Sequence, residues 1–144
     1  MYEPPTDGTP APLVLFHGGG WMLGDLDTRD ALYRELVNEN GCLVASVDYR
    51  IAPEHRFPTG LENCYAATER VAANADALGC QIDALAVAGD SAGGTLTAGV
   101  GLLTCNRDGP EINYQVLAYP ATNHAFETDS YEENNQAYFF AARI

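Results

Sequence analysis

The sequence predicts an α/β fold in which a mostly parallel sheet is flanked by helices. Four short apolar runs alternate with segments of helical periodicity along the 144 residues. The apolar runs are nearly continuous, which is typical of strands that are buried on both faces of a parallel sheet. Two of these runs lead directly into glycine-rich turns. Together these observations predict about four strands and about three helices, joined by right-handed crossovers.

The first strand is expected at residues 13–16 and the second at 42–47, because both runs are short and apolar. Between them, Asp27 is a candidate N-cap for a helix that ends at Gly41. The apolar residues of this helix recur at helical spacing and define one face, formed by Leu32, Leu36 and Val37.

A second helix is expected to begin at Pro58, which suits a first helical turn, and to end at Gly79, where the apolar periodicity stops. Residues 85–88 and 115–119 predict the third and fourth strands. The segment between these strands predicts a helix over residues 91–106. The resulting order of strand and helix is the one that builds a parallel sheet, within a length that fits one domain.

The composition excludes several classes of partner. Seven basic residues, all of them arginine, stand against 20 acidic ones, which gives a formal net charge of −13. Such a charge repels nucleic acid and anionic membrane surfaces. No apolar run is long enough to span a membrane, and the first residues lack the basic and apolar regions of a signal peptide. We therefore expect a cytoplasmic protein that binds neither nucleic acid nor membrane.

The four cysteines predict neither a metal centre nor a disulfide framework. Cys42, Cys64, Cys80 and Cys105 show no close pairing such as C-x-x-C. Each lies in an apolar or helical stretch, so the simplest interpretation is four reduced, buried thiols. The sequence also contains no cofactor motif, and we expect no metal and no cofactor.

A glycine loop, residues 17–21, follows the first predicted strand directly and reads His-Gly-Gly-Gly-Trp. Three consecutive glycines leave backbone N–H groups uncovered by side chains and permit positive φ angles. Such a loop can direct two amides at one anionic oxygen. The alternative is an ordinary flexible turn.

A second unusual turn, residues 89–94, joins the third strand to its helix and reads Gly-Asp-Ser-Ala-Gly-Gly. It matches G-x-S-x-G, in which a sharp strand-to-helix turn exposes the serine hydroxyl. The turn is crowded, so Gly89 and Gly93 need to be small. The amide of Ala92 then lies at a helix N-terminus, where the helix dipole favours negative charge. The alternative is that Ser91 merely caps the helix.

These motifs resemble those of the hormone-sensitive-lipase-like carboxylesterases of the α/β-hydrolase superfamily. Four stretches carry the resemblance in order, namely His17-Gly18-Gly19-Gly20-Trp21, Asp48-Tyr49-Arg50-Ile51-Ala52-Pro53-Glu54, Gly89-Asp90-Ser91-Ala92-Gly93-Gly94 and Tyr119-Pro120. The resemblance implies a hydrolase of short-chain acyl esters that works through an acyl-serine intermediate. Its substrate would be a small-molecule ester.

The same resemblance implies a role for individual residues. Ser91 corresponds to the nucleophile, and the oxyanion hole corresponds to the amides of Gly19, Gly20 and Ala92. A further set of residues supports the site structurally, comprising His17, Gly18, Trp21, Asp48 and Asp90. Tyr49, Arg50 and Glu54 are likewise structural in the family, where they tie the loop after the second strand beneath the site.

A serine hydrolase also needs a histidine base and a carboxylate that orients it, in the chain order serine, acid, histidine. His124 is the one histidine after Ser91, and it follows the fourth strand more closely than the family's base does. The family supplies its acid and histidine from segments that correspond to positions beyond residue 144. We therefore expect residues 1–144 to form a partial catalytic domain, weakly active or inactive by itself, with an exposed fourth strand.

Two other functions compete with this interpretation. A hydrolase scaffold without its base could bind a small ligand without catalysis. Alternatively, Gly18, Gly20 and Gly24 form a loose dinucleotide-binding fingerprint with Asp48 at the end of the next strand. That fingerprint requires a third glycine where Leu23 stands. The sequence leaves the oligomeric state open.

Overall fold

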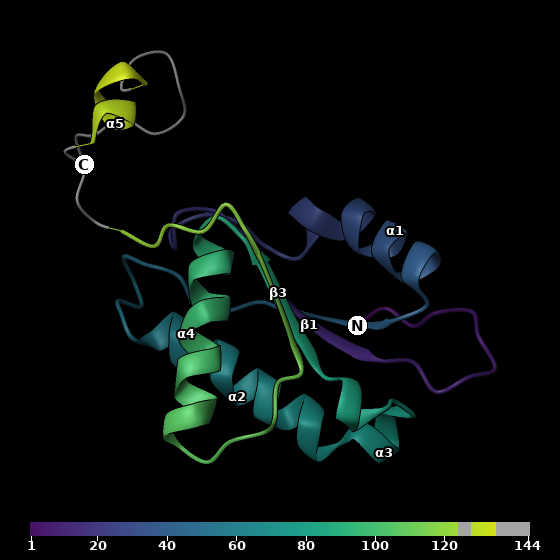
Figure 1. Ribbon diagram of the computed structural model, residues 1–144. Coiled ribbons are helices and arrows are strands. Elements are labelled where there is room, and N and C mark those ends of the chain that lie inside the picture. Colours follow the sequence, from purple (N-terminus) through teal and green to yellow (C-terminus); the bar gives the residue numbers. More distant parts are fainter. Residues whose placement is uncertain (124–127, 135–144) are drawn as a thin grey trace.

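The computed structural model describes residues 1–123 and 128–134, and within them four parallel strands form one sheet (Figure 1). The strands lie in the order β2-β1-β3-β4. They are β1 (Pro12–Phe16), β2 (Leu43–Val47), β3 (Ala86–Asp90) and β4 (Tyr114–Ala118). Every strand lies within one or two residues of the range that the sequence predicts. The predicted α/β fold with a parallel sheet is confirmed.

The register of the two central strands determines where the glycine-rich turns meet. In β1, Phe16 lies opposite Val47 of β2 on one side and Gly89 of β3 on the other. The strands are parallel, so their carboxyl ends share one edge of the sheet. The segments that follow Phe16 and Gly89 therefore emerge next to each other.

Helices cover both faces of the sheet. One core joins β1 and β3 to α2 (Thr59–Ala73) and α4 (Ala92–Asn106) and includes Val14, Phe16, Val87, Leu96 and Val100. A smaller core on the other face joins the sheet to α1 (Asp30–Asn40) and includes Leu15, Tyr33, Val37 and Val44. Figure 1 shows α1 on one side of the sheet and α2 and α4 on the other. The described part of the chain therefore has three layers.

Two details of the predicted helices were wrong. The expected helix from Pro58 to Gly79 is divided into α2 and α3 (Ala75–Leu78), and Asn74 between them has non-helical angles of φ −115° and ψ 17°. The Asn74 side chain donates a hydrogen bond to the Arg70 carbonyl at 2.7 Å, a local contact that competes with helix continuation. Gly79 ends α3 in the left-handed conformation, as predicted.

The start of the first helix also differs. Asp27 does not cap it but opens a 3-10 turn, η1 (Asp27–Arg29), that precedes α1 without a side-chain capping bond. Two short elements complete the described structure, η2 (Ile82–Ala84) and α5 (Asp129–Glu133). No helix in residues 1–123 or 128–134 has the length and apolar character needed to cross a membrane.

The four cysteines are free thiols in the structure and, contrary to expectation, they are not all buried. Cys64 and Cys80 are buried and Cys42 is half-buried, whereas Cys105 is exposed near the end of α4. Burial raises the pKa of the Cys42 and Cys80 thiols above the ordinary cysteine value. The expectation for Cys105 was wrong because its helical position turns away from the core.

Candidate active site

Ser91 occupies a sharp turn between β3 and α4. Its φ of 52° and ψ of −117° lie outside the regions that non-glycine residues favour, a conformation that costs about 1–3 kcal/mol. Ser91 stands at the N-cap position of α4, yet its side chain makes no capping hydrogen bond. The interpretation of Ser91 as an ordinary helix cap therefore does not fit. The backbone fixes the turn instead, because the Ser91 N–H donates to the Ala118 carbonyl at 2.9 Å.

The glycines on either side of Ser91 allow the turn to pack against the end of β1. A Cβ atom on Gly89 would collide with the Gly93 backbone, and one on Gly93 would collide with the Phe16 carbonyl oxygen. The sequence predicts that crowding around the serine requires small residues at these two positions. In the structure, Gly89 and Gly93 contact each other, and both also contact the end of β1. The backbones of β1, β3 and α4 therefore meet with no side chain between them.

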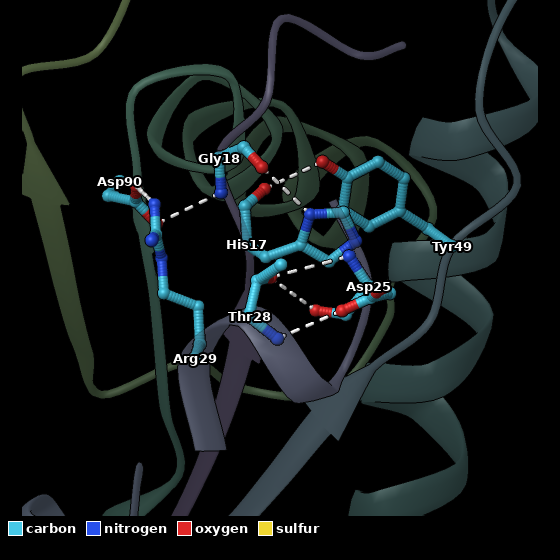
Figure 2. A network of polar contacts seen from close by, with 7 residues as sticks. All are labelled: His17, Gly18, Asp25, Thr28, Arg29, Tyr49 and Asp90. Carbon is cyan, nitrogen blue, oxygen red and sulfur yellow. Dashed lines mark hydrogen bonds and ion pairs between the residues drawn. The ribbon is translucent and has the colours of Figure 1, made fainter. Parts of the chain in front are cut away.

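The glycine loop lies beside this turn. The Gly18 N–H donates to Asp90 Oδ1 at 2.9 Å, which joins the loop after β1 to the residue before Ser91 (Figure 2). Gly19 and Gly20 have φ values of 135° and 60°, which glycine adopts easily. The Gly19 carbonyl accepts hydrogen bonds from the N–H groups of Met22 and Leu23 at 3.1 and 2.9 Å. The loop is therefore a tight, bonded turn.

The dinucleotide interpretation requires the glycines to open a helix. In the structure, residues 18–24 form a loop, and the first helical turn begins only at Asp27. The glycine loop therefore does not itself lead into a helix N-terminus, as the fingerprint requires, and this interpretation does not fit.

His17 lies inside the base of the glycine loop. Its ring is fully buried, stacks on Tyr49 with centroids 4.3 Å apart, and places Nδ1 2.9 Å from the Gly18 carbonyl oxygen. Tyr49, directly after β2, donates its hydroxyl to the His17 carbonyl at 2.6 Å. Burial raises the pKa of Tyr49 well above its usual value, so the hydroxyl stays protonated as a donor. This arrangement braces the loop from β2.

Trp21 and Asp48 were predicted to support the site as well. The carbonyl of Trp21 accepts a hydrogen bond from the Ala52 N–H at 2.9 Å, which ties the glycine loop to the segment after β2. Asp48 is exposed, and within residues 1–123 and 128–134 no hydrogen bond joins it to the loop. Its supporting role stays a prediction, whereas Tyr49 next to it makes direct contact.

Arg29 is part of the site, although the sequence analysis did not identify it. Its Nη2 atom lies 2.7 Å from Asp90 Oδ2, across 61 positions of the chain (Figure 2). The hydrogen bond to Asp90 raises the pKa of the arginine further above its usual value. No local pattern around Arg29 signals this contact, because it depends on how η1 packs over the carboxyl end of β3.

A cavity of about 560 Å³ opens beside the turn. Gly20 and Trp21 line it from the glycine loop, and Thr95 and Leu96 line it from the first turns of α4. Its remaining wall is largely apolar and includes Met22, Phe57, Leu61 and Gly99. Thr95 is one helical turn beyond Ser91, and its N–H donates to the Ser91 carbonyl at 3.1 Å. The cavity therefore reaches the first turns of α4, which follow Ser91, and its largely apolar lining suits an apolar group.

Among the described residues no hydrogen bond joins a histidine to Ser91, although His55 lines the cavity. His17 is enclosed by the loop, and His55 is exposed in the segment before α2. His124 lies outside the described residues. In the part of the chain that the structure describes, no cluster of histidine, cysteine, aspartate and glutamate could hold a metal ion.

A parallel sheet with a glycine-flanked serine at a strand-to-helix turn defines an α/β-hydrolase scaffold, and comparison with known proteins agrees. A model of the family Abhydrolase_3, described as an alpha/beta hydrolase fold, matches residues 13–144. The chain therefore belongs to this hormone-sensitive-lipase-like family of α/β-hydrolases.

Several proteins similar to this chain are named as esterases. Esterase LipI of Mycobacterium tuberculosis is 44% identical over 140 residues, which cover 95% of this chain and 44% of the relative. The arylesterase of Saccharolobus solfataricus is 38% identical over 140 residues, covering 96% and 45% of the two chains. The chain thus spans less than half the length of these relatives.

Solved structures show the same relationship. The crystal structure of DphMB1 superposes with a TM-score of 0.91 at 45% identity, covering 99% of this chain and 47% of the other. A hyperthermophilic esterase from Pyrobaculum calidifontis superposes with a TM-score of 0.80 at 48% identity, covering 83% and 38%. At these identities the likeness extends from the fold to the sequence.

Proposed function

We propose that this chain is the nucleophile-bearing part of a carboxylic ester hydrolase that acts on short-chain acyl esters. The observation that carries the proposal is the position of Ser91 at a sharp turn, directly after the residue whose carboxylate holds the glycine loop. The esterase relatives support the reaction class. Ser91 is the proposed nucleophile.

In the proposed reaction, Ser91 Oγ forms a bond to the ester carbonyl carbon, and the carbonyl oxygen becomes negatively charged. The proposed donors to that oxygen are the N–H groups of Gly19, Gly20 and Ala92. The positive φ angles of the two glycines and the position of Ala92 as the first residue of α4 support this assignment. Pre-aligned amides at a helix N-terminus stabilise such a charge without reorganisation.

The hydroxyl proton of Ser91 then passes to the alcohol oxygen, and the bond between that oxygen and the carbonyl carbon breaks, so that the alcohol leaves. Water next hydrolyses the acyl-serine to a carboxylic acid and restores the Ser91 hydroxyl. The general base and its orienting carboxylate lie outside the described residues in this proposal, because His17 is enclosed and His55 makes no hydrogen bond to Ser91 within them. The apolar cavity next to Thr95 accepts the acyl chain. Without a base we expect hydrolysis of short-chain p-nitrophenyl esters to be slow.

Reaction with a fluorophosphonate tests the proposal, because the reagent phosphonylates a serine whose hydroxyl faces oxyanion donors. We expect slow labelling confined to Ser91, measured by intact mass and peptide mapping. The Ser91→Ala variant should lose the label, and the matched control Ser130→Ala, which changes an exposed serine of α5, should keep it. Labelling that is absent, or unaffected by Ser91→Ala, contradicts the proposal. Ester binding without labelling would favour the non-catalytic ligand-binding alternative.

A further inference from the structure

The Asp90 carboxylate has two partners, and each of its oxygens serves one of them. Oδ1 accepts the Gly18 N–H at 2.9 Å, and Oδ2 pairs with Arg29 Nη2 at 2.7 Å (Figure 2). The fit is close, since a Cβ atom on Gly18 would lie 2.5 Å from Oδ2. The carboxylate therefore links the glycine loop to Arg29 in a single arrangement.

This carboxylate has an electrostatic drawback. Asp90 directly precedes Ser91, and the glycine loop that it holds is the one proposed to stabilise an oxyanion. An uncompensated negative charge here would oppose the negative charge that develops on the substrate. The chain as a whole carries a formal net charge of −13, which adds to this unfavourable field.

Arg29 supplies the compensating positive charge, and a hydrogen-bonded turn fixes the position of its backbone. Arg29 ends η1, whose start is fixed by a small turn in which the Thr28 N–H donates to Asp25 Oδ1 at 2.9 Å and Thr28 Oγ1 donates to the Asp25 carbonyl at 2.8 Å (Figure 2). The side chains of Arg29 and Asp90 are 36% and 20% exposed. Solvent therefore screens this pair less than a fully exposed one.

We infer that Arg29 is a positioning residue that neutralises Asp90, so that the carboxylate can hold the glycine loop without opposing oxyanion formation. The inference rests on the proposed function of Ser91. Arg29 then does more than stabilise the fold. Its charge also affects how well a negatively charged adduct forms on Ser91, the residue next to Asp90.

Phenylboronic acid is a probe that needs no complete catalytic machinery. Its boron forms a bond to Ser91 Oγ, the hydroxyl proton passes to solvent, and no group leaves, so the adduct carries one negative charge. Affinity at fixed pH, followed by boron NMR of the tetrahedral species, measures how well the site stabilises that charge. We expect Arg29→Gln to weaken this affinity by ~10-fold, as one unit charge would at the surface of a protein.

Arg34→Gln is the matched control. Arg34 lies on α1, pairs with Asp30 at 2.8 Å and is more exposed, so this variant removes the same charge without touching Asp90. It should keep the wild-type affinity. Arg29→Lys, which retains the charge, should recover most of the loss, and added salt should reduce the deficit of Arg29→Gln. In an Asp90→Asn background, Arg29→Gln should cause no further loss, because the charge that it compensates is gone.

The outcomes separate the two proposals. A wild-type chain that forms no Ser91-dependent boronate adduct overturns the proposed function, and this inference falls with it. An adduct that forms with equal affinity in the wild type and Arg29→Gln overturns the inference alone. If Arg29→Gln unfolds, Arg29→Met, which removes the charge but keeps an unbranched aliphatic side chain, takes its place in the same comparison. A folded Arg29→Gln that loses affinity equally in the Asp90→Asn background also contradicts the inference.

Discussion

The two central strands and the edge strand β4 contain similar residues in very different surroundings. Val87 of β3 is 0% exposed, whereas Val116 of β4 is 58% exposed and Tyr114 is 65% exposed. Each central strand has a strand on both sides and helices on both faces, but β4 pairs only with β3 among the described strands. Both loops of the candidate site grow from the central strands. The rigidity that the site requires therefore comes from the middle of the sheet, while β4 contributes the Ala118 carbonyl that accepts from Ser91.

The largest effect on stability is expected where the central strands meet the turn at Ser91. Gly93→Ala places a Cβ atom against the Phe16 and His17 carbonyl groups, which are backbone and cannot move aside without shifting the chain. We expect a loss of more than about 3 kcal/mol in the free energy of unfolding, measured by urea denaturation. Gly8→Ala, at an exposed position with only Thr6 Oγ1 nearby at 3.5 Å, should change stability by less than about 0.5 kcal/mol. Similar losses in both variants would contradict the close packing of β1 against α4.

A matched pair of valines tests the comparison between centre and edge directly. Val87→Ala removes two buried methyl groups, and we expect it to destabilise the fold by about 2 kcal/mol. Val116→Ala removes the same groups from an exposed position and should change stability by less than about 0.5 kcal/mol. Urea denaturation of the two variants gives the difference. Equal losses of stability in the two variants would show that Val116 is buried in solution, and thus that the exposed face of β4 is covered.

The strands could be predicted from sequence because burial on both faces leaves a short continuous apolar run. The run at 85–88 is one example, although β3 continues to Asp90 and thereby enters the motif. The break at Asn74 could not be predicted, since Ala72 and Ala75 keep the helical spacing on both sides of it. The Asn74 side chain bonds to the Arg70 carbonyl at the break, and helical periodicity carries no information on such contacts.

The residues of the site fall into two groups: those whose role depends on neighbours in sequence, and those whose role depends on contacts between distant segments. The glycines around Ser91 are constrained by neighbours within a few residues, so a short motif carries the information. Arg29 is different, because its role follows from a contact 61 positions away that exists only once η1 lies over the end of β3. Tyr49 likewise reaches His17 across 32 positions. Sequence reasoning found the motif residues, and the family resemblance implied a structural role for Tyr49, but neither identified Arg29, which holds Asp90 from another element.

The smallest effect is expected on the surface of the helical layer, where Glu62 of α2 meets Arg107 directly after α4. The two side chains form a bidentate pair, at 2.8 and 2.7 Å, with both partners exposed to solvent. Hydrogen bonds from Arg107 lower the pKa of Glu62, so the stabilisation is present above the ordinary pKa of glutamate and is lost as the pH falls through the lowered value.

Glu62→Gln should therefore lower the urea midpoint slightly at pH 7 and less at pH 3. Glu39→Gln, which changes an exposed glutamate of α1, serves as the matched control and should leave the midpoint unchanged at both values. Solvent screens an exposed pair, so geometry as good as that of Arg29 and Asp90 yields much less stabilisation. If Glu62→Gln destabilised the fold as much as Val87→Ala, burial would not explain the difference in stability effects between the centre of the molecule and its surface.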